Sequence, residues 1–207
     1  MLRIILWALL GASLLSLLAG CCGNTACDCQ DLLADSLYFS FPDSTKFSNA
    51  EIGTVYLARY DNASSKVSRD SLPLPRATRT TQTLRNHLVN ELGFKASEVR
   101  GLLVISNNAP FSVASASSNL SRYVYRLYVP QDSASTFKKR TFTTFTFDGI
   151  GLNGNYQADG CCTCYQNTQK LVHVRGGSAY TGAGQNFDVK ESGQGSNRKP
   201  VIIPLYE

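Results

Sequence analysis

Residues 122–129 read RYVYRLYV, and this stretch gives the clearest indication of the fold class. The side chains alternate: one face carries Tyr123, Tyr125, Leu127 and Val129, and the other carries Arg122, Arg126 and Tyr128. A period of two is typical of a β-strand with one buried face. Pro130 follows and ends the run, since proline has no N–H to donate to a neighbouring strand. We therefore expect a strand over 122–129.

Similar short runs of β-branched and aromatic residues recur along the chain between polar, turn-rich segments. They cover 37–41, 54–60, 101–106, 141–147, 170–175 and 201–205, with 187–189 as a weaker candidate. Seven or eight short strands with polar connections are typical of a β-sandwich. The sequence therefore predicts a mainly all-β domain, an immunoglobulin-like or related sandwich, over residues 36–207.

One segment has the period of a helix instead. In 81–92 a single helical face collects Leu84, Leu88, Val89 and Leu92. Gly93 follows in the position of a C-cap, where glycine adopts the left-handed conformation without strain. We expect a short helix packed on the sandwich.

A glycine-rich segment precedes the last predicted strand. Residues 176–199 contain six glycines among polar residues and no sustained apolar pattern. Such a composition predicts a long loop, which is either functional or disordered.

The overall composition limits the classes of partner. The chain has 207 residues, a formal net charge of +5 and 17% charged residues. This length fits one domain, and the charge is too small and too scattered to indicate nucleic-acid binding. We therefore expect no nucleic-acid partner.

The first twenty residues differ from the rest of the chain. They hold its only Met, its only Trp and one charged residue, Arg3, which precedes an apolar stretch from Ile4 to Leu18. This order is typical of a secretory signal peptide. An uncleaved membrane anchor is the alternative, although the stretch is near the lower length limit for spanning a bilayer. Both interpretations place the residues after 22 outside the cytoplasm.

The leader ends in Leu18-Ala19-Gly20-Cys21. This tetrapeptide resembles the lipobox of bacterial lipoproteins, in which an aliphatic residue and two small residues precede a cysteine. The resemblance implies that residues 1–20 are a lipoprotein signal peptide, removed by cleavage. It also implies that acyl chains such as palmitate on Cys21 anchor the mature chain to a membrane of the cell envelope. Residues 21–35 would then form a cysteine-containing tether.

Six further cysteines fall in two clusters, Cys22, Cys27 and Cys29 near residue 21, and Cys161, Cys162 and Cys164 far downstream. An even number in an oxidising compartment predicts disulfides. Adjacent residues lie about 3.8 Å apart at Cα, below the minimum of roughly 4.4 Å for an ordinary disulfide. Bonds between the clusters are therefore favoured, and the connectivity stays open. The alternative is a thiolate metal or redox site, but no histidine lies near either cluster, so we expect no metal and no cofactor.

The residues offer little evidence for catalysis. The chain has two histidines: His87 lies on the flank of the predicted helix, and His173 alternates within a predicted strand, facing solvent or a neighbouring strand. No Gly-x-Ser-x-Gly elbow accompanies them. We therefore predict no catalytic residues and a protein that is not an enzyme, with an envelope hydrolase as the alternative.

Four Asp-Ser pairs are each followed by a small or aliphatic residue, and their serines are Ser36, Ser44, Ser71 and Ser133. They resemble the O-glycosylation acceptor motif of exported proteins in Bacteroidota. Together with the lipobox, the chain resembles the small envelope lipoproteins of that phylum, which implies the outer membrane, on its periplasmic or surface face. Asp-Ser is also ordinary turn chemistry, so both interpretations stay open.

These observations predict a lipid-anchored envelope protein with a binding or structural role. We expect its ligand to be a glycan, another envelope protein or a host surface. The aromatic stretch from Tyr123 to Tyr128 is the best sequence candidate for a contact surface, although core packing accounts for most of it.

Overall fold

The computed structural model describes residues 35–44, 46–107, 109–111, 120–131, 141–159, 162–193 and 198–207. Several of the predictions concern residues outside these ranges. They are the leader 1–20, nearly all of the tether 21–35, the lipidation site Cys21, the cysteines Cys22, Cys27, Cys29 and Cys161, and the acceptor Ser133.

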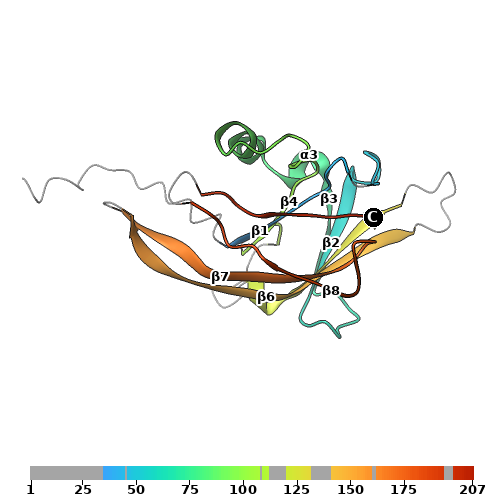
Figure 1. The fold of residues 1–207 in the computed structure, drawn as a ribbon. Helices are drawn as coiled ribbons and strands as arrows, with labels where there is room; N and C mark the ends of the chain where they lie inside the picture. Colours follow the sequence, from blue (N-terminus) through green and yellow to red (C-terminus); the bar gives the residue numbers. More distant parts are fainter. Residues whose placement is uncertain are drawn as a thin grey trace, which may run out of the picture.

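Two β-sheets make up the described part of the chain, as Figure 1 shows. The large sheet has the order β3 (Asp70–Pro75), β2 (Thr54–Tyr60), β5 (Val124–Pro130), β6 (Phe142–Asp159), β7 (Cys162–Gly176) and β8 (Tyr180–Asp188). The small sheet has the order β4 (Leu103–Ser106), β1 (Ser36–Ser40) and β9 (Ile202–Pro204). All pairs are antiparallel except β1 with β9. The predicted all-β sandwich is confirmed, with nine strands in the described residues.

The core lies between the two sheets. Inward side chains of the large sheet, among them Leu57, Leu127 and Phe147, pack against Phe39 and others of the small sheet. The rings of Phe39 and Phe147 stack with their centroids 4.0 Å apart. Burial of apolar surface, at about 25 cal/mol per Å², is what holds the two layers together.

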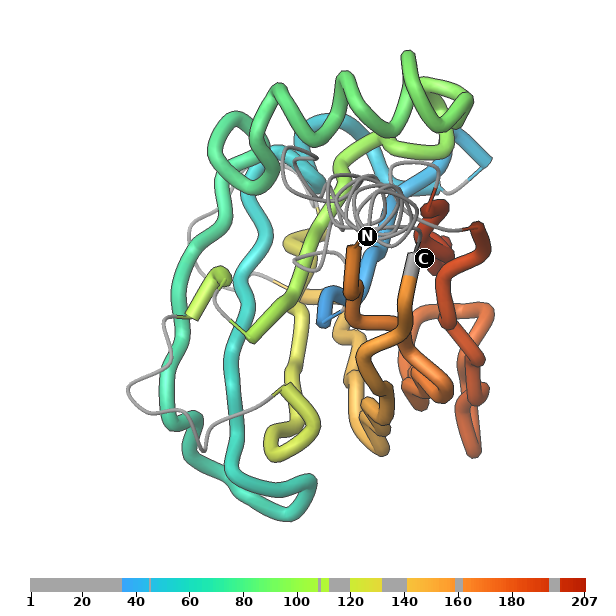
Figure 2. The backbone as a smooth tube through the Cα atoms, turned by 90° about the vertical axis from the view of Figure 1, so that its left-hand side faces the viewer, coloured from blue at the N-terminus to red at the C-terminus, as the bar shows by residue number. Residues whose placement is uncertain are grey.

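A helical segment covers the opposite face of the small sheet (Figures 1 and 2). It consists of α3 (Arg76–Arg79), α4 (Gln82–Asn86) and η1 (His87–Glu91), the last being a turn of π-helix. A further short 3-10 turn, η2 (Leu120–Arg122), precedes β5. Leu88 and Leu92 bury their side chains against Tyr38 of β1.

The helix predicted over 81–92 is confirmed, together with both of its ends. The Thr81 side chain caps it by accepting a hydrogen bond from the Leu84 N–H at 3.2 Å. Gly93 has φ +73°, as the predicted C-cap requires.

The strands differ in how well their sequences predicted them. The strand β2 has the predicted bounds, and β5 is displaced by only one or two residues. By contrast, β3 was not predicted because it contains Pro73 and Pro75. The sheet tolerates them because β3 is its edge and pairs only with β2. The strands β6 and β7 extend well beyond their apolar parts as a long polar hairpin.

The prediction of a loop over 176–199 is wrong for its first half. Residues Tyr180–Asp188 form β8, which pairs with β7 from Leu171↔Asp188 to Gly176↔Tyr180. The composition of this segment did not predict a strand, because an edge strand is held by main-chain hydrogen bonds and needs little apolar side-chain surface. Tyr180 and Val189 still pack into the core at its two ends.

Candidate functional site

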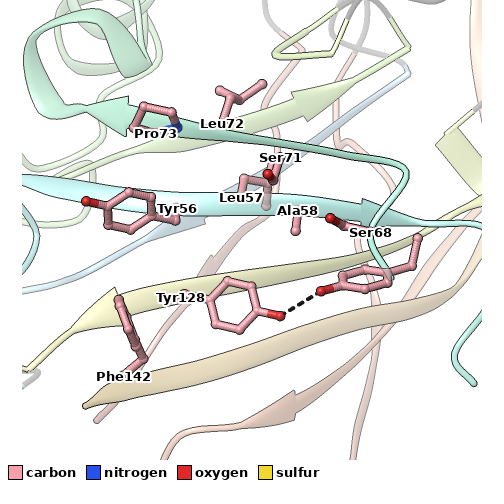
Figure 3. A pocket seen from close by; sticks show the side chains of 10 residues that line it. Tyr56, Leu57, Ala58, Ser68, Ser71, Leu72, Pro73, Tyr128 and Phe142 are labelled. Carbon is pink, nitrogen blue, oxygen red and sulfur yellow. Dashed lines mark hydrogen bonds between the residues drawn. The ribbon is translucent and has the colours of Figure 1, made fainter. Parts of the chain in front are cut away.

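The outer face of the large sheet carries an aromatic groove. It is a cavity of about 350 Å³ at β2, β3 and β5 and the start of β6. Its lining residues are Tyr56, Leu57, Ala58, Tyr60, Ser68, Ser71, Leu72, Pro73, Tyr128 and Phe142. Figure 3 shows Tyr56 between Pro73 of β3 above it and Tyr128 and Phe142 below it, with Ser68 at the right-hand end beyond Ala58.

Strand alternation places these rings on one face. In β2 the side chains of Val55 and Leu57 enter the core, so Tyr56 and Tyr60 point to the other face of the sheet. The register pairs Tyr56 with Tyr128 of β5. Residues far apart in the sequence therefore meet across neighbouring strands.

The rings are fixed by contacts with one another. Phe142 lies edge-on to Tyr56 at 6.1 Å between centroids and to Tyr128 at 6.2 Å. The hydroxyls of Tyr60 and Tyr128 are hydrogen-bonded at 2.8 Å (Figure 3). The Arg126 guanidinium lies 4.2 Å from the Tyr60 ring centroid, a cation–π contact that fixes the ring.

The residues that line the aromatic groove carry no charge, and the Arg126 guanidinium borders it at the Tyr60 ring. The lining residues include no acid, lysine or arginine. Burial raises the pKa of Tyr128, and the hydrogen bond with Tyr60 raises it further. The Tyr128 phenol therefore stays protonated at physiological pH and can both donate and accept hydrogen bonds.

The sequence candidates for a contact surface divide between the two faces of β5. Tyr123 and Tyr125 are buried in the core, so core packing accounts for them and they form no part of a contact surface. Tyr128 lies on the outer face and lines the aromatic groove. The missed residues are Tyr56 and Tyr60, which stand four apart in β2. This spacing on a strand places them on one face and was the signal that could have found them.

The two histidines make structural contacts. His173 Nδ1 lies 2.7 Å from Asp148 Oδ1, and His173 Nε2 lies 2.8 Å from the Ala183 carbonyl oxygen. Arg175 pairs with the second oxygen of Asp148. His173 thus faces a neighbouring strand on each side and links β6, β7 and β8. His87 Nδ1 lies 2.9 Å from Glu91 Oε2, one turn away.

Of the six clustered cysteines, Cys162 and Cys164 lie within the described residues, and each is disulfide-bonded. Among the described residues, no three His, Cys, Asp or Glu side chains gather closely enough to hold a metal ion.

The serine acceptors differ in accessibility. Ser36 is 4% exposed within β1, so its hydroxyl is not accessible to a glycan in the folded chain. Ser44 and Ser71 are exposed. Ser71 also lines the aromatic groove, so a glycan on it would occupy part of that site.

A second hollow, about 550 Å³, lies beside α4 and is lined by Arg76, Arg85 and Arg100 among others. Beneath it Arg79 donates to the carbonyls of Leu74, Gly101 and Ile52. Burial, with Arg76 and Arg85 nearby, lowers the pKa of Arg79 to about 10. Its main role is to tie α3 to the sandwich.

Comparison of the chain with protein-family models, with curated proteins and with solved structures gives no match. Among the helices of the described residues, none has the length and apolar character needed to cross a membrane. The function is therefore argued from the geometry of the site.

Proposed function

We propose that this protein is a binding module of the bacterial cell envelope, and that the aromatic groove takes a neutral glycan. The observation that carries the proposal is the cluster of Tyr56, Tyr128 and Phe142 on a sheet face that no described segment covers, with Phe142 42% exposed. Exposing the apolar surface of such rings to water is unfavourable in free energy. A ligand that covers them recovers that free energy.

A sugar ring matches the two kinds of surface in the aromatic groove. Its C–H face is apolar and flat enough to lie on Tyr or Phe, whereas its hydroxyls need donors and acceptors. The phenols of Tyr60 and Tyr128 supply both, and Ser68 and Ser71 lie opposite. The absence of charge among the lining residues favours a neutral ligand over an acidic one.

The second part of the proposal is a lipid anchor at Cys21, which accounts for the location at the cell envelope. Acyl chains on Cys21, as the lipobox resemblance implies, would hold the chain at the outer membrane. Each buried methylene adds about 0.8 kcal/mol of membrane affinity, so the folded part needs no membrane-binding surface of its own. The aromatic groove can then be devoted to a ligand.

The rival functions have less support. A hydrolase needs a histidine whose free nitrogen faces a nucleophile. Both ring nitrogens of His173 face protein acceptors. The Nε2 of His87 is buried and has no hydrogen-bond partner in the described residues, a nucleophile's hydroxyl or thiol included. A thiolate metal site needs free thiolates, whereas Cys162 and Cys164 are bonded.

Glycan binding by the purified protein tests the proposal. We expect saturable binding of a neutral oligosaccharide on an array, confirmed by calorimetry, without release of shorter sugars. Tyr56→Ala and Phe142→Ala should each weaken binding by about tenfold or more, since losing a large aromatic contact costs on the order of 2 kcal/mol.

Tyr156→Ala is the matched control, because Tyr156 is 68% exposed but lies outside the aromatic groove. It should bind as the unaltered chain does. Equal loss in Tyr156→Ala, or glycan cleavage abolished by His173→Ala, would contradict the proposal.

A further inference from the structure

Three arginines from different segments line the hollow beside α4. Arg76 belongs to α3, Arg85 to α4, and Arg100 lies shortly before β4, and all three border this cavity of about 550 Å³. The cavity, here named the arginine hollow, lies beside the helical segment at the top of Figure 2. Among the described residues that line it, Asp43 is the one acid. Three arginines against one aspartate leave an excess of two positive charges.

A neutral side chain holds two of these guanidinium groups close together. Asn49 Oδ1 accepts a hydrogen bond from Arg76 Nη1 at 3.2 Å and another from Arg100 Nη2 at 3.1 Å. Two like charges that share one acceptor repel each other, and an amide does not neutralise them. Arg100 also pairs with Asp43 through Nε at 3.3 Å. Arg76 and Arg85 have no carboxylate partner within the described part of the chain.

A fourth arginine, Arg79, adds positive charge from beneath the arginine hollow. It is 7% exposed, and its guanidinium donates to three backbone carbonyls. Burial, with the charges of Arg76 and Arg85, lowers its pKa to about 10, so it stays charged at neutral pH. The acids of the neighbouring segments do not line the hollow, and each is bonded within its own segment: Glu51, Glu91 and Glu98.

Some donors of Arg76 and Arg85 reach the surface without a partner. The Arg76 side chain donates through Nη1, and that of Arg85 donates through Nη2 to the Thr80 carbonyl at 3.5 Å. Arg76 Nε and Nη2 and Arg85 Nη1 make no hydrogen bond in the described residues. None of these three atoms is among the buried side-chain atoms that lack a partner, unlike Arg85 Nε. They are therefore accessible to a solute in the arginine hollow.

We propose that the arginine hollow binds the phosphate group of a small solute, with Arg76 and Arg85 as its direct ligands. A phosphate monoester carries close to two negative charges at neutral pH, which balances the excess of two positive charges, whereas a carboxylate would leave one. Guanidinium groups bind phosphate oxygens through parallel N–H donors. Asn49 and Arg100 act as positioning residues for the Arg76 side chain.

The size of the arginine hollow fits a phosphorylated small molecule. Its volume of about 550 Å³ lies in the ordinary range of small-molecule sites and leaves room beside the phosphate group. The amides of Gln82 and Asn86 on α4 also line it and can contact the rest of the solute. The arginine hollow shares no lining residue with the aromatic groove, so the two proposals can fail independently.

Thermal unfolding of the full chain at pH 8 tests the proposal. Phosphate, sulfate, acetate and dimethyl phosphate are titrated against chloride at constant ionic strength. The titrations stay in the millimolar range, because phosphate and sulfate at high concentration stabilise folded proteins non-specifically. We expect phosphate and sulfate, both tetrahedral dianions, to raise the melting temperature with the logarithmic dependence of a ligand that binds only the folded state. Acetate should have no more effect than chloride. Dimethyl phosphate, a diester with one charge like the phosphate of a phospholipid, should bind more weakly than phosphate.

Substitutions of the direct ligands locate the effect. Arg76→Met and Arg85→Met should each weaken the phosphate affinity by about tenfold or more, as expected for losing a hydrogen bond to a charged group. Arg69→Met is the control, because Arg69 is an exposed arginine that does not line the arginine hollow. It should respond to phosphate as the unaltered chain does.

Asn49→Asp tests the charge balance itself. The substitution keeps the oxygen that accepts from Arg76 and Arg100 and adds a negative charge to the hollow. We expect the melting temperature in chloride to rise, because two guanidinium groups gain an ion pair, and the further rise with phosphate to be largely lost. A variant that is merely destabilised would not show these opposite changes.

Three results would overturn the proposal. The first is a melting temperature that phosphate raises no more than acetate or chloride does. The second is dimethyl phosphate binding as tightly as phosphate, which would assign a singly charged lipid-like diester instead. The third is a full phosphate response in Arg76→Met, Arg85→Met or Asn49→Asp. If an arginine variant does not fold, Asn49→Asp decides the question.

Discussion

At the scale of single residues, buried tyrosines couple stability to alkaline pH. Burial raises the pKa of both Tyr125 and Tyr180 to about 12 from the ordinary value of 10.0. Between these values the unfolded chain has lost the protons that the folded chain keeps. Stability therefore falls as pH rises above 10. Denaturant unfolding at pH 8 and pH 11 should show this fall.

Tyr180→Phe separates this effect from general alkaline damage. The variant loses the hydrogen bond to the Pro204 carbonyl, so it should be less stable at pH 8 by about 1 kcal/mol. Its further loss between pH 8 and pH 11 should be smaller than that of the unaltered chain, because one ionising group is gone. A parallel pair of pH curves would contradict the assignment.

Some residues could be located from the sequence and others could not. The alternation around His173 predicted contact with solvent or a neighbouring strand, and the ring does face neighbouring strands. Its partner Asp148 could not be predicted, since a register shift between Asp148 and Gly151 sets the pairing. The burial of Arg198 was equally hidden, because it depends on packing after β8 and not on any local pattern.

At the scale of elements, the hairpin of β7 and β8 depends on glycine at its turn and within β8, for two separable reasons. Gly177 and Gly182 have φ +60° and +69°, which side chains other than glycine rarely adopt. A Cβ on Gly177 would also overlap the Tyr206 carbonyl and the Phe145 ring, whereas a Cβ on Gly182 meets nothing within 4 Å.

The two alanine variants therefore differ in cost. Gly182→Ala should lose about 1 kcal/mol, the cost of the left-handed backbone alone. Gly177→Ala should lose about 2 kcal/mol more through overlap in the core. Denaturant unfolding of both variants measures the difference, and equal losses would show that the overlap is relieved without cost.

Whether a strand could be predicted from the sequence depends on whether side-chain burial or main-chain pairing stabilises it. The strands β2 and β5 were predicted because their core faces need apolar side chains at every second position. The strands β3 and β8 carry prolines or glycines and are held mainly by pairing at the two edges of the large sheet. Their pairing energy lies in the main chain, so their side chains give little indication of it.

At the scale of the whole molecule, the layers explain where the aromatic groove lies. The small sheet covers one face of the large sheet, and the helical segment covers the small sheet in turn. In the described residues, Ala58, Tyr60 and Val124 form a separate apolar cluster on the remaining face. The sequence predicted the sandwich but not this groove, because the groove exists only once β2, β3, β5 and β6 have their register.

The cysteines bear on a second property of the whole molecule, its crosslinking by disulfide bonds. Cys162 and Cys164 lie at the start of β7 and are disulfide-bonded. We predict that bonds to the cluster of Cys22, Cys27 and Cys29 tie the lipid-bearing end to the sandwich. A bond closing more than a hundred residues restricts the unfolded chain by up to about 4.7 kcal/mol in the chain-entropy model. Further bonds at the same place would add far less.

Intact mass and a peptide map of the native, membrane-extracted protein test this closure. Without reductant, the map should contain peptides that join the two clusters. With reductant, the mass should rise by two hydrogens per bond, and the melting temperature should fall. The mass should also begin at Cys21 and include its acyl chains.

Cys162→Ser with Cys164→Ser should reproduce the fall in melting temperature without reductant, because it removes the bonds at β7 and leaves Cys21 in place. Bonds confined to each cluster, or a melting temperature insensitive to both treatments, would show that the sandwich is stable without this tie.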